Sequence, residues 1–206
     1  STERFMPDNE LKRLALKYDL HMAQAQLKHF GTDGNREMML KMIAYLSEKI
    51  TIYTNTEVTD IDKNAHRLKC TTRDGRLDLT ADRIILALGR AGSRFFSRWC
   101  ASNKIEVENN QVDVGVRVEL PAIVWEEFSS KIYEPKIKYR SKAYGDTTRM
   151  FCFNERGSVV TENTDGVQTV NGHAYHDPAR KTNNSNFALL TTIKFTEPFN
   201  NPIEYA

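Results

Sequence analysis

Residues 82–89 read Asp-Arg-Ile-Ile-Leu-Ala-Leu-Gly, a continuous apolar run that ends in glycine. Such a run is typical of a parallel strand that is buried on both faces. Glycine at its end lets the backbone approach a ligand closely, as at many nucleotide sites. A simple strand-to-helix turn is the alternative explanation for Gly89. Ser93 is predicted to cap the following helix, which carries Phe95, Phe96 and Trp99.

The residues before this run predict extended structure. Residues 50–53 read as a short buried strand, and residues 58–61 as the next extended piece. Residues 68–71 and 77–79 flank Arg73-Asp74-Gly75-Arg76, and Asp-Gly between extended runs is a strong hairpin signal. We therefore expect a three-stranded antiparallel meander.

Two amphipathic helices are predicted nearer the N-terminus. The first is N-capped by Asp8 and carries Leu11 and Ala15 at helical spacing. The second follows Gly31-Thr32-Asp33-Gly34, where Asp33 or Asn35 can act as the cap. Its apolar stripe is predicted to pack in a core. The stripe consists of Met38, Met39, Met42, Ile43 and Leu46.

Strand patterns dominate from about residue 105, so we predict two domains, 1–104 and 105–206, of mixed α/β (α+β) class. Residues 112–120 alternate between apolar and polar side chains, which places Arg117 and Glu119 on the same side. A short helix is expected around Trp125. Further strands are predicted at residues 151–153, 159–161, 167–170 and 187–195.

The composition is that of a folded globular protein. Of 206 residues, 40% are hydrophobic and 27% are charged, which excludes a disordered or fibrous chain. The formal charge of +2 is too small to attract the whole chain to nucleic acid or to a membrane. No stretch approaches the roughly 20 apolar residues of a membrane span, and the first thirty residues are unlike a signal peptide. We expect a cytoplasmic protein with no nucleic-acid or membrane partner.

The three cysteines, Cys70, Cys100 and Cys152, are far apart and odd in number, which argues against a disulfide framework or a zinc site. His173 and His176, with Asp177, could begin a metal site, but no third cluster completes it, and we favour a solvent-accessible turn. No metal site is predicted.

Several segments resemble, in the same order, the uncharacterised FAD-dependent dehydrogenase family. The likeness covers most of the chain. The segments are His29-Phe30-Gly31-Thr32-Asp33, Ile84-Ile85-Leu86-Ala87-Leu88-Gly89-Arg90-Ala91-Gly92-Ser93, Val114-Gly115-Val116-Arg117-Val118-Glu119-Leu120-Pro121, Val170-Asn171-Gly172-His173 and Asn184-Ser185-Asn186.

The resemblance implies a two-domain flavoprotein oxidoreductase. Its first domain would be a partial FAD-binding, Rossmann-like domain with the meander, and its second a β-rich domain facing substrate and flavin. FAD would be the cofactor, with NAD(P) left open as a second one, and the small-molecule substrate is unknown. The implied cofactor-binding residues are Thr32, Asp33, Gly89, Arg90 and Gly92.

The ten glycines contain no Gly-x-Gly pair, so the dinucleotide fingerprint that grips the pyrophosphate is absent from this sequence. We therefore expect an internal piece of a larger enzyme that binds FAD weakly or not at all by itself and is inactive alone. Strand edges and apolar faces that the missing element would cover should then be exposed. Such surfaces predict self-association, for example as a dimer.

Three residues are candidates for the chemistry. Cys152 corresponds by order to a cysteine near the flavin in the family, although a plain strand cysteine beside Phe151 and Phe153 is the alternative. His173, in the matching Asn-Gly-His segment, could act as a general acid or base. Arg117 could hold a carboxylate or phosphate of the substrate, or form a cross-strand ion pair with an acidic neighbour.

A non-catalytic binding module is the alternative function. Residues 131–142 interleave basic and aromatic side chains, from Lys131 to Lys142, which could hold a polyanion or a protein partner. The alternation of Lys136, Lys138 and Arg140 is equally typical of an exposed edge strand, which charged side chains protect from aggregation. We favour the edge strand.

Overall fold

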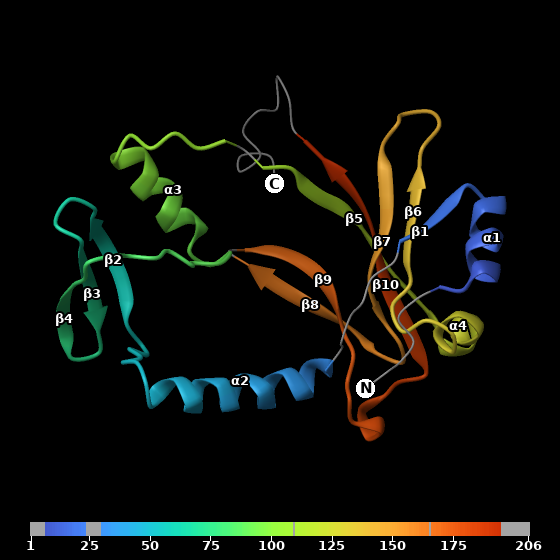
Figure 1. Cartoon of the computed structure of the whole chain (residues 1–206), viewed down its shortest axis with the longest axis horizontal. Helices are drawn as coiled ribbons and strands as arrows, with labels where there is room; N and C mark the ends of the chain where they lie inside the picture. The colour runs from blue at the N-terminus through green and yellow to red at the C-terminus, as the bar shows by residue number, and fades with distance from the viewer. Residues whose placement is uncertain (1–6, 24–29, 109, 165, 195–206) are drawn as a thin grey trace. The chain divides into compact units, whose positions relative to one another are not determined.

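The structure is a computed structural model that describes residues 7–23, 30–108, 110–164 and 166–194 (Figure 1). The chain divides into two compact units: unit 1 comprises Ser1–Met42 and Asn109–Ala206, and unit 2 comprises Ile43–Glu108. Helices are combined with antiparallel sheets, so the predicted mixed α+β class is confirmed. Within the described ranges, no helix has both the length and the apolar character to cross a membrane.

Unit 1 is built on a five-stranded antiparallel sheet in which the strands run side by side in the order β1-β6-β7-β10-β5 (Figure 1). The predicted strands near residues 112, 151 and 187 are confirmed as β5, β7 and β10. The sheet contains β1 (Leu20–Ala23), β5 (Val112–Pro121), β6 (Lys136–Arg140), β7 (Thr147–Asn154) and β10 (Asn184–Ile193).

Unit 1 contains further helices and strands besides this sheet. The strands predicted at residues 159–161 and 167–170 are confirmed as β8 (Ser158–Thr164) and β9 (Val167–His173), which pair as a hairpin. The first helix, α1 (Asn9–Lys17), begins as predicted, because the Asp8 carboxylate accepts a hydrogen bond of 2.8 Å from the Leu11 N–H. The helix α4 (Ala122–Ser129), the 3₁₀ turn η1 (Pro178–Arg180) and the part of α2 (Gly31–Ser47) up to Met42 also belong to the unit.

A bulge that interrupts the alternation along β7 decides which of its side chains enter the core of unit 1. Phe153 is 1% exposed, whereas Phe151, two residues earlier, is 44% exposed because the strand shifts its register between them. The indole of Trp125 packs edge-on against the rings of Phe153 and Phe187, with centroids 5.7 and 5.1 Å away. Met150 completes the buried cluster, so the core lies between β7, β10 and α4.

The prediction that Lys136, Lys138 and Arg140 guard an edge strand is wrong. Their strand, β6, pairs with β1 on one side and with β7 on the other, so it lies inside the sheet. Only four residues form β1, and their pattern was too short to be recognised in the sequence. The pairing of β1 with β6 also brings the N-terminal segment into unit 1. The domain boundary that the sequence predicted at residue 104 lies close to the end of unit 2 at Glu108.

Unit 2 contains the predicted meander, β2 (Glu57–Asp62), β3 (Arg67–Thr72) and β4 (Gly75–Thr80). Thr72 pairs with Gly75, so Arg73 and Asp74 form the turn, and Gly75 adopts a φ of 127°. The helix α3 (Ser93–Ser102) follows. Its N-cap is Gly92, without a side-chain hydrogen bond, so the prediction that Ser93 caps this helix is wrong by one residue.

Two predicted strands are absent from unit 2. Residues 50–53 and 84–88 form no ladder with any described strand, and the prediction of two-sided burial is wrong, since Ile85 is 90% exposed. Ile50, Ile52 and Tyr53 are also exposed. A parallel strand is buried only when strands and helices cover it, and no described element pairs with these segments.

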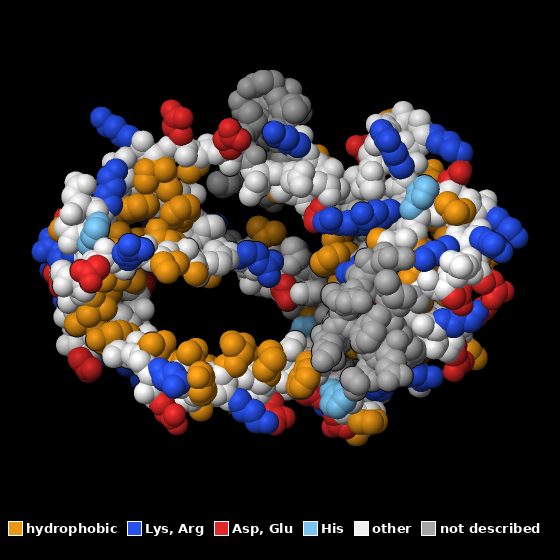
Figure 2. All heavy atoms as spheres, viewed as in Figure 1, with side chains coloured by type: hydrophobic (Ala, Val, Ile, Leu, Met, Phe, Trp, Pro, Cys, Tyr) orange, Lys and Arg blue, Asp and Glu red, His pale blue; other side chains and the backbone are white. Residues whose placement is uncertain are grey.

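The second predicted helix is α2 (Gly31–Ser47), which starts three residues earlier than an N-cap at Asp33 would place it. Its apolar stripe does not pack in a core as predicted. The five side chains of the stripe, from Met38 to Leu46, are 37% to 50% exposed, and Figure 2 shows hydrophobic side chains along this helix. Helical periodicity identifies an apolar face but does not supply the surface that covers it.

Candidate functional site

Polar side chains gather in unit 1 where the sheet meets the β8–β9 hairpin. We call these residues the Arg117 cluster: Arg117 on β5, Asn154 at the end of β7, Asn171 on β9 and Asn186 on β10. Each residue comes from a different strand. The cluster therefore forms only when all four strands are assembled.

Strand register places these side chains together. Arg117 lies opposite Ala188, and Asn186 lies opposite Glu119, so Arg117 and Asn186 are diagonal neighbours across the β5–β10 pair. On its other side, Asn186 lies opposite Asn154. The register of β7 against β10 shifts just beyond this pair, at a bulge that contains Cys152 in the left-handed region, with a φ of 51°.

Hydrogen bonds hold the guanidinium of Arg117 against oxygens of neutral groups. Its Nη1 donates to Asn186 Oδ1 at 2.7 Å and to the Cys152 carbonyl at 3.4 Å. Its Nη2 donates to Asn171 Oδ1 at 3.4 Å. The Asn154 amide also donates to Asn186 Oδ1, at 3.3 Å, so that oxygen accepts two hydrogen bonds.

The positive charge of Arg117 is not neutralised by an ion pair. Within the described ranges, no carboxylate lies within ion-pair distance of its guanidinium, so the cross-strand ion pair considered from the sequence does not form. Glu162 approaches only through an intermediate amide, since its Oε1 accepts 2.9 Å from Asn171 Nδ2. A half-buried guanidinium without a counter-ion is well suited to bind an anionic or strongly electron-rich oxygen.

Gly172 has no side chain, which allows the polar side chains of the Arg117 cluster to lie close together. A Cβ at this position would lie 2.3 Å from Arg117 Nη1, Asn154 Nδ2 and Asn186 Oδ1. Any larger residue would therefore displace these polar atoms. This close approach is the physical reason for glycine in the Asn-Gly-His segment.

Two nitrogen atoms of the cluster are buried without a hydrogen-bond acceptor among the described residues. They are Arg117 Nε and Asn186 Nδ2. Asn186 is 0% exposed, so solvent does not reach its amide. A buried donor without a partner costs free energy, and in native proteins it often marks the position of a bound water, ion or ligand.

The two predicted catalytic residues lie differently with respect to this cluster. Cys152 joins it, because its carbonyl accepts from Arg117 and from Asn154, and its Sγ lies 3.5 Å from Asn154 Nδ2. His173 follows Gly172 and is half-buried, with its ring edge-on to Tyr175 at 6.5 Å between centroids. In the described part of the chain, no three His, Cys, Asp or Glu side chains converge as metal ligands.

Thr32 and Asp33 connect the start of α2 to the segment after β9. The Thr32 N–H donates to the Ala174 carbonyl at 2.8 Å. The Asp33 carboxylate accepts from the backbone N–H groups of His176 and Asp177, at 2.8 and 2.9 Å. These two hydrogen bonds lower the pKa of Asp33 to about 2. Both carboxylate oxygens are therefore engaged by the protein itself.

The other predicted cofactor-binding residues, Gly89, Arg90 and Gly92, lie in unit 2 between the extended residues 84–88 and α3. Gly89 has a φ of 60°, and no heavy atom lies within 4 Å of the place of a Cβ. Gly92, in contrast, sits against Leu88, where a Cβ would lie 2.5 Å from the Leu88 side chain. The backbone at Gly89 is thus open to a close approach from outside.

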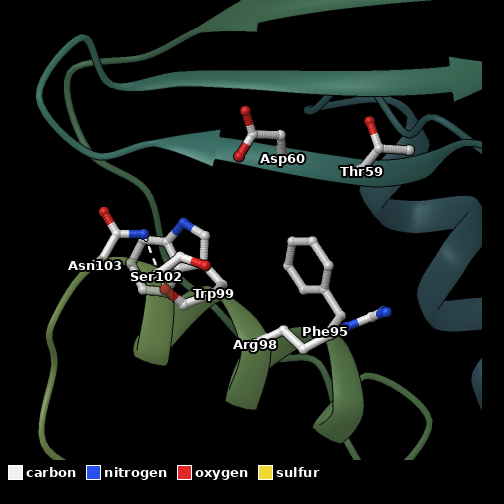
Figure 3. A pocket seen from close by; sticks show the side chains of 7 residues that line it. All are labelled: Thr59, Asp60, Phe95, Arg98, Trp99, Ser102 and Asn103. Atoms are coloured by element: carbon white, nitrogen blue, oxygen red, sulfur yellow. Dashed lines mark hydrogen bonds between the residues drawn. The ribbon is translucent and has the colours of Figure 1, made fainter.

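Unit 2 also has a pocket of about 310 Å³ between β2 and α3. Phe95 and Trp99 point from α3 toward the strand that carries Thr59 and Asp60 (Figure 3). The Trp99 indole N–H donates to the Ile61 carbonyl at 2.7 Å, which fixes the ring in the wall. The Asp60 carboxylate is paired with Lys69 at 2.8 Å, so the pocket combines an aromatic wall with a neutralised polar one.

The basic segment of the alternative function is neutralised in part, at two of its five basic side chains. Lys136 pairs with Glu134 at 2.6 Å and also lies over the ring of Phe151. Lys142 pairs with Asp19 at 2.6 Å, which raises the pKa of Lys142. A surface that binds polyanions needs cations that are not already paired, and pairing removes Lys136 and Lys142 from those that this segment could offer.

Sequence reasoning found Arg117 and Cys152 but missed the three asparagines that surround the guanidinium. The predicted strands gave no signal for them, because the ranges predicted at residues 151–153, 167–170 and 187–195 each stop one residue short of Asn154, Asn171 and Asn186, which the structure places in β7, β9 and β10. Their convergence depends on the strand order, which the sequence does not reveal.

Comparison of the chain with models of known protein families and with curated protein sequences finds no match.

Proposed function

We propose that this chain forms part of a flavin-dependent oxidoreductase and that the Arg117 cluster faces the reacting molecules. One observation carries the proposal: among the residues that the structure describes, only neutral oxygens hold the Arg117 guanidinium, and the fully buried amide N–H₂ group of Asn186 beside it has no acceptor. Such an arrangement suits a ligand that presents oxygen acceptors. Flavin ring carbonyls and the oxygens of oxidisable organic substrates both have this character.

Some of the residues that an FAD site needs are present in this sequence, but the glycine-rich element for the pyrophosphate is not. Gly89 has the positive φ and the open surroundings that a closely approaching nucleotide requires, and Arg90 and Gly92 adjoin it. The sequence has no Gly-x-Gly element to hold the pyrophosphate. When bound, FAD would supply an acceptor for two electrons as a hydride from the substrate. We infer that Gly89, Arg90 and Gly92 contribute to its site without being sufficient for tight binding.

The residues of this chain would then position the substrate and accept a proton from it. Arg117 would orient a substrate oxygen and stabilise negative charge that develops on it. His173, half-buried beyond Gly172, would accept the proton that the substrate releases with the hydride. Cys152 would line the same region, with its thiol close to the Asn154 amide.

Flavin binding by the natural gene product that contains this sequence tests the proposal directly. The purified product, supplemented with FAD and freed of excess, should be yellow and carry about one flavin per chain, whereas these 206 residues alone should retain little. A gene product that stays colourless with excess FAD would refute the flavin role. A salt-dependent shift with nucleic acid, without flavin, would support the binding module instead.

A further inference from the structure

The strongest unexplained feature of the described residues is the pair of unpartnered donors in the Arg117 cluster. Arg67 and Arg149 also have a buried Nε without an acceptor. Their terminal nitrogens, however, reach the carboxylates of Asp62 and Asp113, so both charges are neutralised. Arg117 combines an unpartnered Nε with an unneutralised charge.

The unpartnered group of Asn186 is a donor. An amide can be turned by 180°, which exchanges its oxygen and its nitrogen. Turning Asn186 would set its N–H₂ group against the donors Arg117 Nη1 and Asn154 Nδ2, which now share its oxygen. The observed orientation is therefore the stable one, and the missing partner of Nδ2 must be an acceptor.

The unpaired positive charge of Arg117 indicates that this acceptor is negatively charged. A neutral acceptor such as a buried water would satisfy the Asn186 amide but would leave the guanidinium without a counter-ion. A carboxylate offers two acceptor oxygens in one plane and one negative charge, which matches two free donors and one unpaired cation. Arg117, Asn171 and Cys152 are only half-buried, so the cluster borders solvent at these residues, whereas the two donor atoms themselves are buried.

We propose that the Arg117 cluster is a carboxylate-binding site, in which Asn186 Nδ2 and Arg117 Nε donate to the two carboxylate oxygens. The proposal rests on the proposed function in one respect: in an oxidoreductase, the bound carboxylate belongs to the substrate. The substrate class is then a small organic acid. Gly172 supports the site by leaving room for Arg117 and Asn186 to meet.

Thermal unfolding of the chain without flavin tests the site. Acetate, succinate and benzoate would be titrated from about 1 to about 100 mM at pH 7, a range that brackets weak affinities, with chloride keeping the ionic strength constant. At least one carboxylate should raise the midpoint Tm in proportion to the logarithm of its concentration above Kd. Acetamide, which is neutral, should have no such effect.

The variant Asn186→Asp distinguishes binding from general stabilisation. It places a carboxylate of the protein beside Arg117, so the chain should remain folded, as circular dichroism would check, while added carboxylates bind at least tenfold more weakly. Arg149→Gln, at a half-buried arginine of the same sheet whose charge is paired with Asp113 instead, is the matched control and should keep the wild-type response.

Three outcomes would overturn the proposal. They are equal stabilisation of the wild type and Asn186→Asp, stabilisation by acetamide as strong as by acetate, and no stabilisation by any carboxylate, which would leave a buried water as the partner. Stronger stabilisation by inorganic phosphate would assign the site to a different anion. Because no flavin is present, such a failure leaves the FAD test of the gene product unaffected.

Discussion

Arg117 on β5 and Asn186 on β10 are diagonal neighbours across one antiparallel strand pair, and a hydrogen bond of 2.7 Å joins the guanidinium Nη1 to the amide Oδ1. Asn186 is completely buried, whereas Arg117 is partly accessible. The buried amide thus holds one end of a charged group whose Nε has no acceptor among the described residues. A guanidinium placed in this way is oriented before any ligand arrives, which reduces the entropy cost of binding.

Replacing Gly172 with alanine should disturb the Arg117 cluster. The new Cβ would meet three polar atoms at 2.3 Å, and two of these atoms belong to the buried Asn154 and Asn186, which have little room to move. We expect a loss of about 1–3 kcal/mol in unfolding free energy and loss of carboxylate-dependent stabilisation. Urea denaturation and the acetate titration measure both.

Val170→Thr is the control for Gly172→Ala, because Val170 is an exposed residue of the same strand and threonine keeps its branched shape. This variant should change the unfolding free energy by less than about 0.5 kcal/mol. If Gly172→Ala behaved like Val170→Thr in both assays, the close packing at Gly172 would have no energetic importance.

Phe153→Ala should destabilise unit 1 strongly. Phe153 is almost fully buried and contacts Trp125 in the core cluster, so its removal leaves a cavity and should cost about 3–5 kcal/mol. Phe151→Ala, on the same strand but 44% exposed, should cost less than about 1 kcal/mol. Chemical denaturation followed by tryptophan fluorescence measures both, and similar losses would mean that the burial pattern of β7 is incorrect.

Asp33 should make the stability of the chain depend on pH in the acid range. Its pKa is about 2 in the folded chain, against an ordinary value of 3.8, so the folded state favours the carboxylate. The contribution is complete above about pH 4 and disappears as the pH falls through about 2. The stability difference between wild type and Asp33→Asn should therefore be constant from pH 7 to 5 and shrink between pH 4 and 2.

Urea unfolding at a series of pH values measures this difference. Glu126→Gln serves as the control, since Glu126 is an exposed side chain of α4 in the same unit, and it should match the wild type at pH 7. A difference for Asp33→Asn that grows as the pH falls would show that the hydrogen bonds from His176 and Asp177 do not stabilise the carboxylate.

The exposed apolar face of α2 predicts self-association. Met39 and Ile43 lie one turn apart and are each about half exposed, and apolar patches of this kind favour contact with a second surface. Sedimentation should detect species heavier than the 23.7 kDa chain. The double variant Met39→Glu and Ile43→Lys, which adds a favourable Glu–Lys pair to the helix, should reduce them.

Tyr144→Gln tests whether this effect is specific to α2. Tyr144 is a single exposed aromatic residue outside any helix or strand, and its replacement should leave self-association unchanged. A wild-type chain that sediments as a monomer at tens of micromolar would contradict the prediction.

Local signals predicted much of the fold correctly. The Asp8 cap set the start of α1, the Asp-Gly turn set the β3–β4 hairpin, and alternation located β5, because each signal depends on neighbours within a few residues. The failures involved burial and pairing. The stripe of α2 and residues 84–88 are apolar, yet the described residues provide nothing to cover them.

The amino-acid sequence by itself determined where most helices and strands of this protein lie, and it singled out Arg117 as a residue facing the same side as Glu119. Only the tertiary structure decided that Arg117 meets Asn154, Asn171 and Asn186, and that β6 lies inside the sheet. The physical reason is range: helix caps, turns and alternation are interactions between near neighbours, whereas a buried polar cluster depends on the order and register of strands that lie up to 69 residues apart.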